Sequence, residues 1–143
     1  MAGVESKDAL VLCVDDDSDI RELLTRVLSH AGYKVETARD GDTGLAAVEL
    51  RKPEVVLLDI KMPGKSGIEV LKELKQSNPD LQIIMVSGIG DLSTALDCIK
   101  MGAADFVVKP FTHKDILRRV DEALETKRFL DKTRGFLKQA ETS

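Results

Sequence analysis

The sequence contains no tryptophan, one tyrosine and four phenylalanines among 143 residues. Proteins that hold single-stranded nucleic acids by stacking need several aromatic side chains, so this composition argues against direct nucleic-acid binding by this segment. Hydrophobic residues nevertheless make up 43% of the chain. We therefore expect one domain whose core consists mainly of aliphatic side chains.

Long hydrophobic runs are also missing. No apolar run approaches the roughly 20 residues that span a bilayer, and residues 1–9 lack the cationic start and apolar stretch of a signal peptide. The two cysteines, Cys13 in an apolar run and Cys98 in a helical pattern, suit small core residues better than a disulfide or a metal clip. These absences predict a cytoplasmic protein without membrane contact.

Charge is unevenly distributed along the chain. Residues 1–125 contain 16 Lys and Arg against 23 Asp and Glu, which gives −7, whereas residues 126–143 contain 5 against 2, which gives +3. The sequence therefore predicts an acidic body followed by a basic tail.

Short apolar runs alternate with segments of helical periodicity. The runs predict five strands, at residues 9–14, 33–38, 54–59, 81–87 and 105–108. The segments between and after them predict five helices, at residues 18–32, 43–50, 68–76, 92–102 and from His113 onward. Because parallel strands need crossover connections, this alternation indicates an α/β fold, a flavodoxin-like doubly wound parallel sheet of order 2-1-3-4-5 flanked by five helices.

Polar residues stand where these predicted strands end. They are Asp15 and Asp16 just after the first strand, Asp59 as the last residue of the third, Ser87 as the last residue of the fourth and Lys109 just after the fifth. Since the carboxyl ends of parallel strands form the ligand crevice, we expect these side chains to converge. Carboxylates about 4 Å apart repel by roughly 4 kcal/mol at an effective dielectric near 20. Such a cluster favours a hard cation, Mg²⁺, together with phosphate oxygens.

Four motifs together resemble the receiver domains of two-component response regulators, including those of the chemotaxis type. They are VDDD at 14–17, LLDIKMPGKSG at 57–67, VSG at 86–88 and DFVVKPF at 105–111. The resemblance implies an N-terminal arm at residues 1–7, a receiver domain at 8–126 and a helical extension or linker at 127–143.

The same resemblance implies a phosphorylation mechanism. Asp59 would be the phosphoacceptor, taking a phosphoryl group from a sensor histidine kinase, and the protein would accept this group stoichiometrically instead of acting as an ordinary enzyme. Asp15, Asp16, Asp59 and the backbone carbonyl of Lys61 would hold Mg²⁺. Positioning and charge neutralisation are the main requirements of phosphoryl transfer, and this cluster supplies both.

Other residues of the motifs would grip the phosphoryl group and transmit the signal. In the resemblance, the Ser87 hydroxyl and the Lys109 ammonium hold phosphoryl oxygens, the Lys109–Pro110 peptide bond is cis, and Ser87 and Phe106 form a switch. The face made by the fourth helix, fifth strand and fifth helix would then bind partners. Phe106 lacks the hydroxyl of the tyrosine often found there, so only packing can stabilise its inward position.

Two positions near the predicted site bear on the lifetime of a phosphorylated state. Ile89, two residues after Ser87, offers no polar group to orient a hydrolytic water, and Lys61, two residues after Asp59, is placed to shield the acyl phosphate. We therefore expect a fairly long-lived phosphorylated state.

Two rival functions remain open from the sequence. One is an aspartate-nucleophile Mg²⁺-dependent phosphatase, although such enzymes commonly place an acid where Lys61 stands. The other is a nucleotide- or flavin-binding domain, which the lack of a glycine-rich loop after the first strand disfavours.

The tail has two readings. Apolar residues recur at every seventh position toward the end of the chain, which predicts a helix that can pair with a second copy to form a homodimer. These residues are Ile116, Ala123, Leu130 and Leu137. Gly135 weakens this seam. The alternative is a basic linker. The face of the fourth helix, fifth strand and fifth helix is a second candidate surface for a homodimer.

Overall fold

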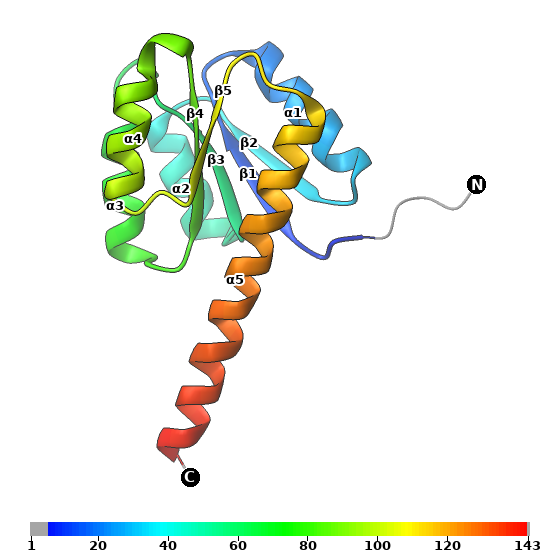
Figure 1. Ribbon diagram of the computed structural model, residues 1–143, viewed down its shortest axis with the longest axis vertical. Coiled ribbons are helices and arrows are strands. Elements are labelled where there is room, and N and C mark those ends of the chain that lie inside the picture. Colours follow the sequence, from blue (N-terminus) through cyan, green and yellow to red (C-terminus); the bar gives the residue numbers. More distant parts are fainter. Residues whose placement is uncertain (1–5, 143) are drawn as a thin grey trace, which may run out of the picture.

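A computed structural model describes residues 6–142 and shows one parallel sheet between two layers of helices (Figure 1). The strands are β1 (Leu10–Val14), β2 (Lys34–Ala38), β3 (Val55–Asp59), β4 (Gln82–Ser87) and β5 (Asp105–Val108). The helices are α1 (Ser18–His30), α2 (Gly41–Arg51), α3 (Gly67–Ser77), α4 (Leu92–Lys100) and α5 (His113–Thr142), with a 3₁₀ turn, η1 (Ile89–Asp91), before α4. The strand order β2-β1-β3-β4-β5 confirms the predicted flavodoxin-like fold.

Helix α2 begins two residues earlier than the sequence analysis predicted. Asp40 occupies the cap position, where its Oδ1 accepts a hydrogen bond of 2.9 Å from the backbone N–H of Thr43. The Thr43 hydroxyl in turn accepts from the backbone N–H of Asp40 at 3.3 Å. This reciprocal capping satisfies free N–H groups at the helix start, so Gly41 and Asp42 join the helix.

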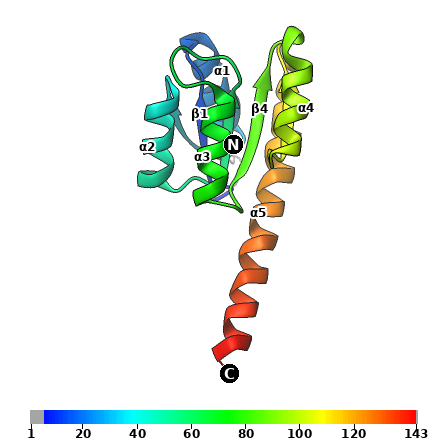
Figure 2. The same cartoon turned by 90° about the vertical axis from the view of Figure 1, so that its left-hand side faces the viewer.

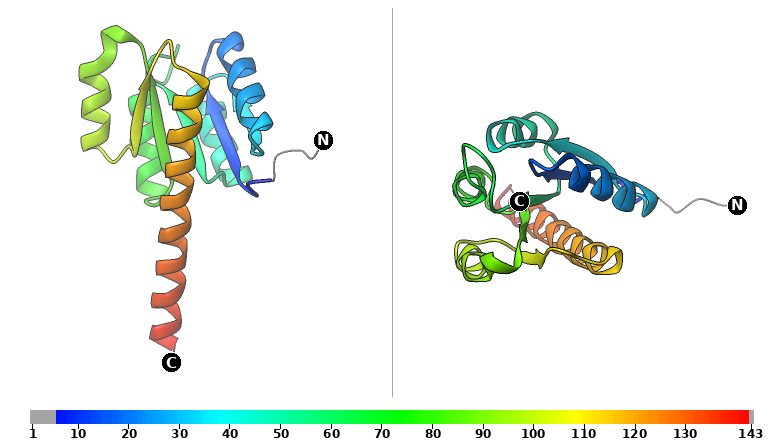
Figure 3. Two further views of the ribbon diagram at one scale, coloured as in Figure 1. Left: turned by 45° about the vertical axis from the view of Figure 1, so that its right-hand side comes forward. Right: turned by 90° about the horizontal axis from the view of Figure 1, so that it is seen from above.

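The strands β1, β3 and β4 are buried on both faces, and alternate residues along them belong to different cores. Helices α2, α3 and α4 cover one face, and α1 and α5 cover the other (Figures 2 and 3). In β1, for example, Leu12 and Val14 face the first core while Val11 and Cys13 face the second. Both cysteines are buried and free, as predicted.

The register of the sheet brings the strand ends together. Val14 of β1 pairs with Leu58 of β3, Asp59 pairs with Val86 of β4, and Ser87 pairs with Val108 of β5. The residues that follow β1, β3, β4 and β5 therefore emerge along one edge of the sheet.

Helix α5 continues well beyond the sheet (Figure 1). Its 30 residues correspond to about 45 Å. Arg134 holds the lower part of the helix to the body through Asp80, with Nη2 at 2.7 Å from Oδ1, and Arg128 donates to the backbone carbonyl of Lys7. Within residues 6–142, neither α5 nor any other helix combines the length and the apolar character that crossing a bilayer requires.

Candidate functional site

Three carboxylates meet at the edge of the sheet. Asp15, Asp16 and Asp59 each offer an oxygen, and these atoms lie within 4.8 Å of one another. Asp15 is only 2% exposed and Asp59 only 7%, whereas Asp16 is open to solvent. The structure thus brings together the acidic residues that the sequence analysis placed side by side.

Asp15 is fixed by its neighbours in the turn between β1 and α1. Its Oδ1 accepts a hydrogen bond of 2.9 Å from the backbone N–H of Asp17, and its backbone carbonyl accepts one of 2.8 Å from Nη1 of Arg21. Asp17 also caps α1, because its Oδ1 accepts from the N–H of Asp19. The role of Arg21 was missed from the sequence, where this residue is one of several polar positions on α1.

The other carboxylate oxygen of Asp15, Oδ2, is in a different environment from Oδ1. Asp15 Oδ2 is buried and accepts no hydrogen bond. Its polar neighbour is the Lys109 ammonium, with Nζ at 3.2 Å in an ion-pair contact; the same Nζ lies 3.8 Å from Oδ1 of Asp59. A buried carboxylate oxygen without a hydrogen bond is costly, so this position fits a further positive ligand.

Lys109 is held at the strand end by the backbone. Its N–H donates to the carbonyl of Ser87 at 2.7 Å, and the Lys109–Pro110 peptide bond is cis, as predicted. The ammonium therefore reaches the acidic cluster from β5 while the carboxylates approach from β1 and β3.

Asp59 has an unusual protonation equilibrium. Burial, followed by the nearby charge of Asp15, raises its pKa to about 7, and Asp16 adds to this effect. Lys109 and a hydrogen bond from the backbone N–H of Lys61 act in the opposite direction. The carboxylates thus repel one another more strongly than Lys109 alone compensates, which fits a site for a divalent cation with oxygen ligands.

Gly67 sets the path of the chain around Asp59. A Cβ atom at position 67 would lie 2.2 Å from the backbone oxygen of Asp59, and the Gly67 N–H donates to the carbonyl of Ile60 at 2.9 Å. In the sequence, this glycine is only the last residue of the LLDIKMPGKSG motif. The structure shows that α3 approaches the end of β3 so closely that no side chain fits.

The two predicted switch residues lie near the site without touching the carboxylates. The Ser87 hydroxyl is fully buried and donates to the carbonyl of Gly88 at 2.9 Å, and Phe106 is partly buried against the core beneath α4. The Lys61 ammonium lies outside the acidic cluster, 3.1 Å from Oδ1 of Asp91. The single hydroxyl proton of Ser87 is thus engaged by the Gly88 carbonyl.

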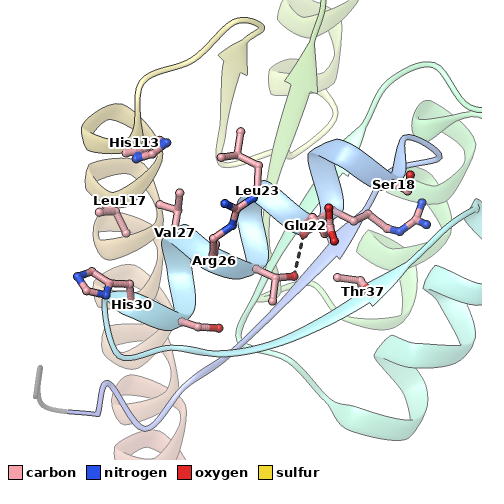
Figure 4. A pocket seen from close by; sticks show the side chains of 12 residues that line it. Ser18, Glu22, Leu23, Arg26, Val27, His30, Thr37, His113 and Leu117 are labelled. Atoms are coloured by element: carbon pink, nitrogen blue, oxygen red, sulfur yellow. Dashed lines mark hydrogen bonds between the residues drawn. The ribbon is translucent and has the colours of Figure 1, made fainter.

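A separate hollow of about 1190 Å³ lies between α1 and α5 (Figure 4). Its lining includes Leu23, Arg26, His30, His113 and Leu117. None of the strand-end residues described above lines it, so this hollow is distinct from the acidic site.

The sequence profile described as "Response regulator receiver domain" matches residues 11–121. The chain belongs to the response regulator receiver family. This receiver domain is 40% identical over 120 residues to the nitrogen assimilation regulatory protein NtrX of Azorhizobium caulinodans, in a match that covers 82% of this chain and 26% of that protein. It is 39% identical over 115 residues to the DNA-binding transcriptional regulator NtrC of Salmonella typhimurium, with 80% and 24% covered. The chain thus spans about a quarter of the length of these two relatives.

Solved structures agree with this assignment. The receiver domain of NtrX from Brucella abortus is 42% identical and has a TM-score of 0.79, with 81% of this chain and 98% of that chain covered. The chemotaxis protein CheY4 of Vibrio cholerae is 31% identical, with a TM-score of 0.75 and coverages of 80% and 98%. A receiver domain is a signalling module and not a classical enzyme, so family membership argues against the phosphatase alternative.

Proposed function

We propose that Asp59 accepts a phosphoryl group from a sensor histidine kinase. A carboxylate oxygen of Asp59 attacks phosphorus while the P–N bond of the kinase phosphohistidine breaks. The imidazole keeps the electron pair and takes up a proton, and Asp59 becomes an acyl phosphate. The observation that carries this proposal is the position of the Asp59 carboxylate, buried within the acidic cluster with the Lys109 ammonium at 3.8 Å.

We further propose that the site takes Mg²⁺, held by Asp15, Asp16, Asp59 and the Lys61 carbonyl. The donor set supports this, since carboxylate and carbonyl oxygens are the protein ligands that Mg²⁺ prefers. The buried Asp15 Oδ2 without a hydrogen bond is a second supporting observation. When bound, the ion neutralises charge on the phosphoryl oxygens.

The proposed output begins with Ser87. A phosphoryl group carries about −2 near pH 7 and offers strong acceptor oxygens, so the Ser87 hydroxyl exchanges the Gly88 carbonyl for a phosphoryl oxygen. Movement of Ser87 leaves space into which Phe106 packs. The face of α4, β5 and α5 then changes shape, and the exposed Leu92 and Leu96 of α4 support it as a partner surface.

Phosphorylation with a small-molecule donor tests the assignment. In acetyl phosphate and Mg²⁺, the wild type should gain one phosphoryl group by intact mass, and Asp59→Asn should gain none while keeping its fold. Asp19→Asn is the matched control, since Asp19 lies in the first turn of α1 outside the cluster. Retained labelling of Asp59→Asn would contradict the assignment.

We also propose that two copies pair through the extension at residues 127–143, whose described part belongs to α5 and whose last residue lies outside the described range. Two positions of the predicted seven-residue repeat, Ile116 and Ala123, are buried in the core of the single chain, so that part of the prediction is wrong. In the extension itself, Phe129, Phe136 and Leu137 are at least half exposed, at 67%, 71% and 56%. By helical spacing, both phenylalanines lie on the side of α5 opposite Arg134, which contacts the body.

The whole protein would act in the cytoplasm, where its phosphoryl donor is formed.

A further inference from the structure

An ion pair joins the two loops that flank Asp59. Nζ of Lys61, in the loop after β3, lies 3.1 Å from Oδ1 of Asp91, the last residue of η1 after β4. The Lys61 side chain is 79% exposed, whereas the Asp91 side chain is only 15% exposed. The lysine is therefore the movable partner and the aspartate the fixed one.

The Asp91 side chain does not cap α4. It occupies the cap position of α4, where an aspartate usually accepts from a backbone N–H of the first turn, but its side chain makes no such bond. Its Oδ2 instead lies beside Gly88, 3.4 Å from the position of a Cβ on that glycine. The carboxylate thus faces the loop that follows Ser87.

Lys61 is also close to the phosphoacceptor. Lys61 follows Asp59 by two residues in the loop after β3, so its backbone lies next to the phosphoacceptor. The flexible four-carbon stem lets the ammonium change direction while the backbone stays in place. The Lys61 ammonium can therefore form an ion pair either with Asp91 or with a negatively charged group bound to Asp59.

We propose that Asp91 is a positioning residue that holds Lys61 away from Asp59 until the phosphoryl group arrives. This inference rests on the proposed phosphorylation of Asp59. A phosphoryl group with a charge near −2 then outcompetes the single charge of Asp91. Lys61 moves to a phosphoryl oxygen and shields the acyl phosphate from water, and Asp91 is released to cap α4.

Lifetime measurements on four proteins test this exchange: the wild type, Asp91→Asn, Lys61→Met and the double variant. Asp91→Asn frees Lys61, so the half-life of the acyl phosphate should lengthen by about two- to fivefold, the size expected for an exposed ion pair. Lys61→Met should shorten the half-life. The central expectation is that Asp91→Asn has no effect in the Lys61→Met background. The Mg²⁺-dependent affinity for beryllofluoride should likewise rise in Asp91→Asn and fall in Lys61→Met. In the Lys61→Met background, Asp91→Asn should leave this affinity unchanged.

Asp97→Asn is the matched control, because it removes an equal charge from an exposed position of α4 and should leave the half-life unchanged. An equal effect of Asp91→Asn with and without Lys61 would overturn the inference, since Asp91 would then act by its charge alone. An unchanged half-life in Asp91→Asn would overturn it as well. Absence of phosphoryl uptake in all four proteins would instead remove the proposed function together with this inference.

Discussion

The Lys109 ammonium lies 3.2 Å from Asp15 Oδ2, the buried oxygen that accepts no hydrogen bond. Because the same ammonium is 3.8 Å from Asp59, one cation serves two carboxylates. Under the proposed function, Lys109 turns toward a phosphoryl oxygen only when another positive charge takes its place beside Asp15. The proposal therefore predicts that metal binding and phosphoryl binding are coupled through the position of Lys109.

Removal of the Lys109 charge should destabilise the metal-free protein. In Lys109→Met, Asp15 is left buried without its counter-charge, and we expect a loss of about 1–3 kcal/mol in the free energy of unfolding. Millimolar Mg²⁺ should restore much of this loss because the ion supplies the missing charge. Urea unfolding in EDTA and in Mg²⁺ measures both effects. Lys72→Met, at an exposed position of α3, is the control.

The pKa of Asp59 predicts how stability depends on pH. Its value rises from 3.8 to about 7 in the fold, mainly through burial and the charge of Asp15. A carboxyl group with a raised pKa stabilises the fold fully below its unfolded-state pKa, and this contribution is lost as the pH rises through 7. Without metal, the wild type should therefore lose on the order of 3 kcal/mol relative to Asp59→Asn between about pH 4 and pH 8.

Denaturant titrations of both proteins at several pH values in EDTA provide the measurement. Mg²⁺ at pH 8 should stabilise the wild type by mass action and act more weakly on Asp59→Asn, which has lost a ligand. Parallel pH profiles of the two proteins would show that Asp59 titrates normally and would refute this prediction.

Gly67→Ala should damage both stability and phosphorylation. The added methyl would lie 2.2 Å from the backbone oxygen of Asp59, so either α3 or the end of β3 must shift. We expect a loss of at least about 2 kcal/mol in unfolding free energy and reduced phosphoryl uptake. Gly90→Ala is the control, because a Cβ at position 90 meets no atom within 4 Å. Equal behaviour of the two variants would argue against the close approach.

Much of the site was predictable because residue types and the alternation of strands with helices can be read from the sequence, and this alternation is typical of one common strand order. Asp15 and Asp59 each follow a buried apolar run, and parallel strands place such positions along one edge. Adjacency of β1 and β3 then brings the carboxylates together. The periodicity of the chain thus predicts the elements, and the usual strand order of this fold class predicts the acidic cluster.

The contacts that tune the site were not predictable in this way. The pairing of Lys61 with Asp91 depends on how two loops pass each other, and neither residue belongs to a periodic pattern. The bond from Arg21 to the Asp15 carbonyl depends on a rotamer at the start of α1. Likewise, a glycine such as Gly67 indicates a turn, but a 2.2 Å approach requires the path of the backbone itself.

The exposed face of α5 predicts association between copies. In dynamic light scattering or sedimentation, the wild type should show a concentration-dependent dimer, because burying Phe129 and Phe136 against a second helix removes large apolar surfaces from water. Phe136→Glu should shift the protein to monomer. Its unfolding free energy should change by less than about 0.5 kcal/mol per protomer, since the side chain is 71% exposed in the single chain.

Leu50→Glu is the matched control for this experiment, because Leu50 is similarly exposed at 77% but belongs to α2 and not to α5. Wild type and Leu50→Glu should associate alike. If the wild type stays monomeric at high concentration, the dimer proposal is wrong and the alternative of a basic linker is supported. In that case the repulsion between the positive charges of two tails would exceed the gain from a short apolar contact. A dimer that survives Phe136→Glu would instead assign the contact to the face of α4, β5 and α5, where Leu96→Glu should then abolish it.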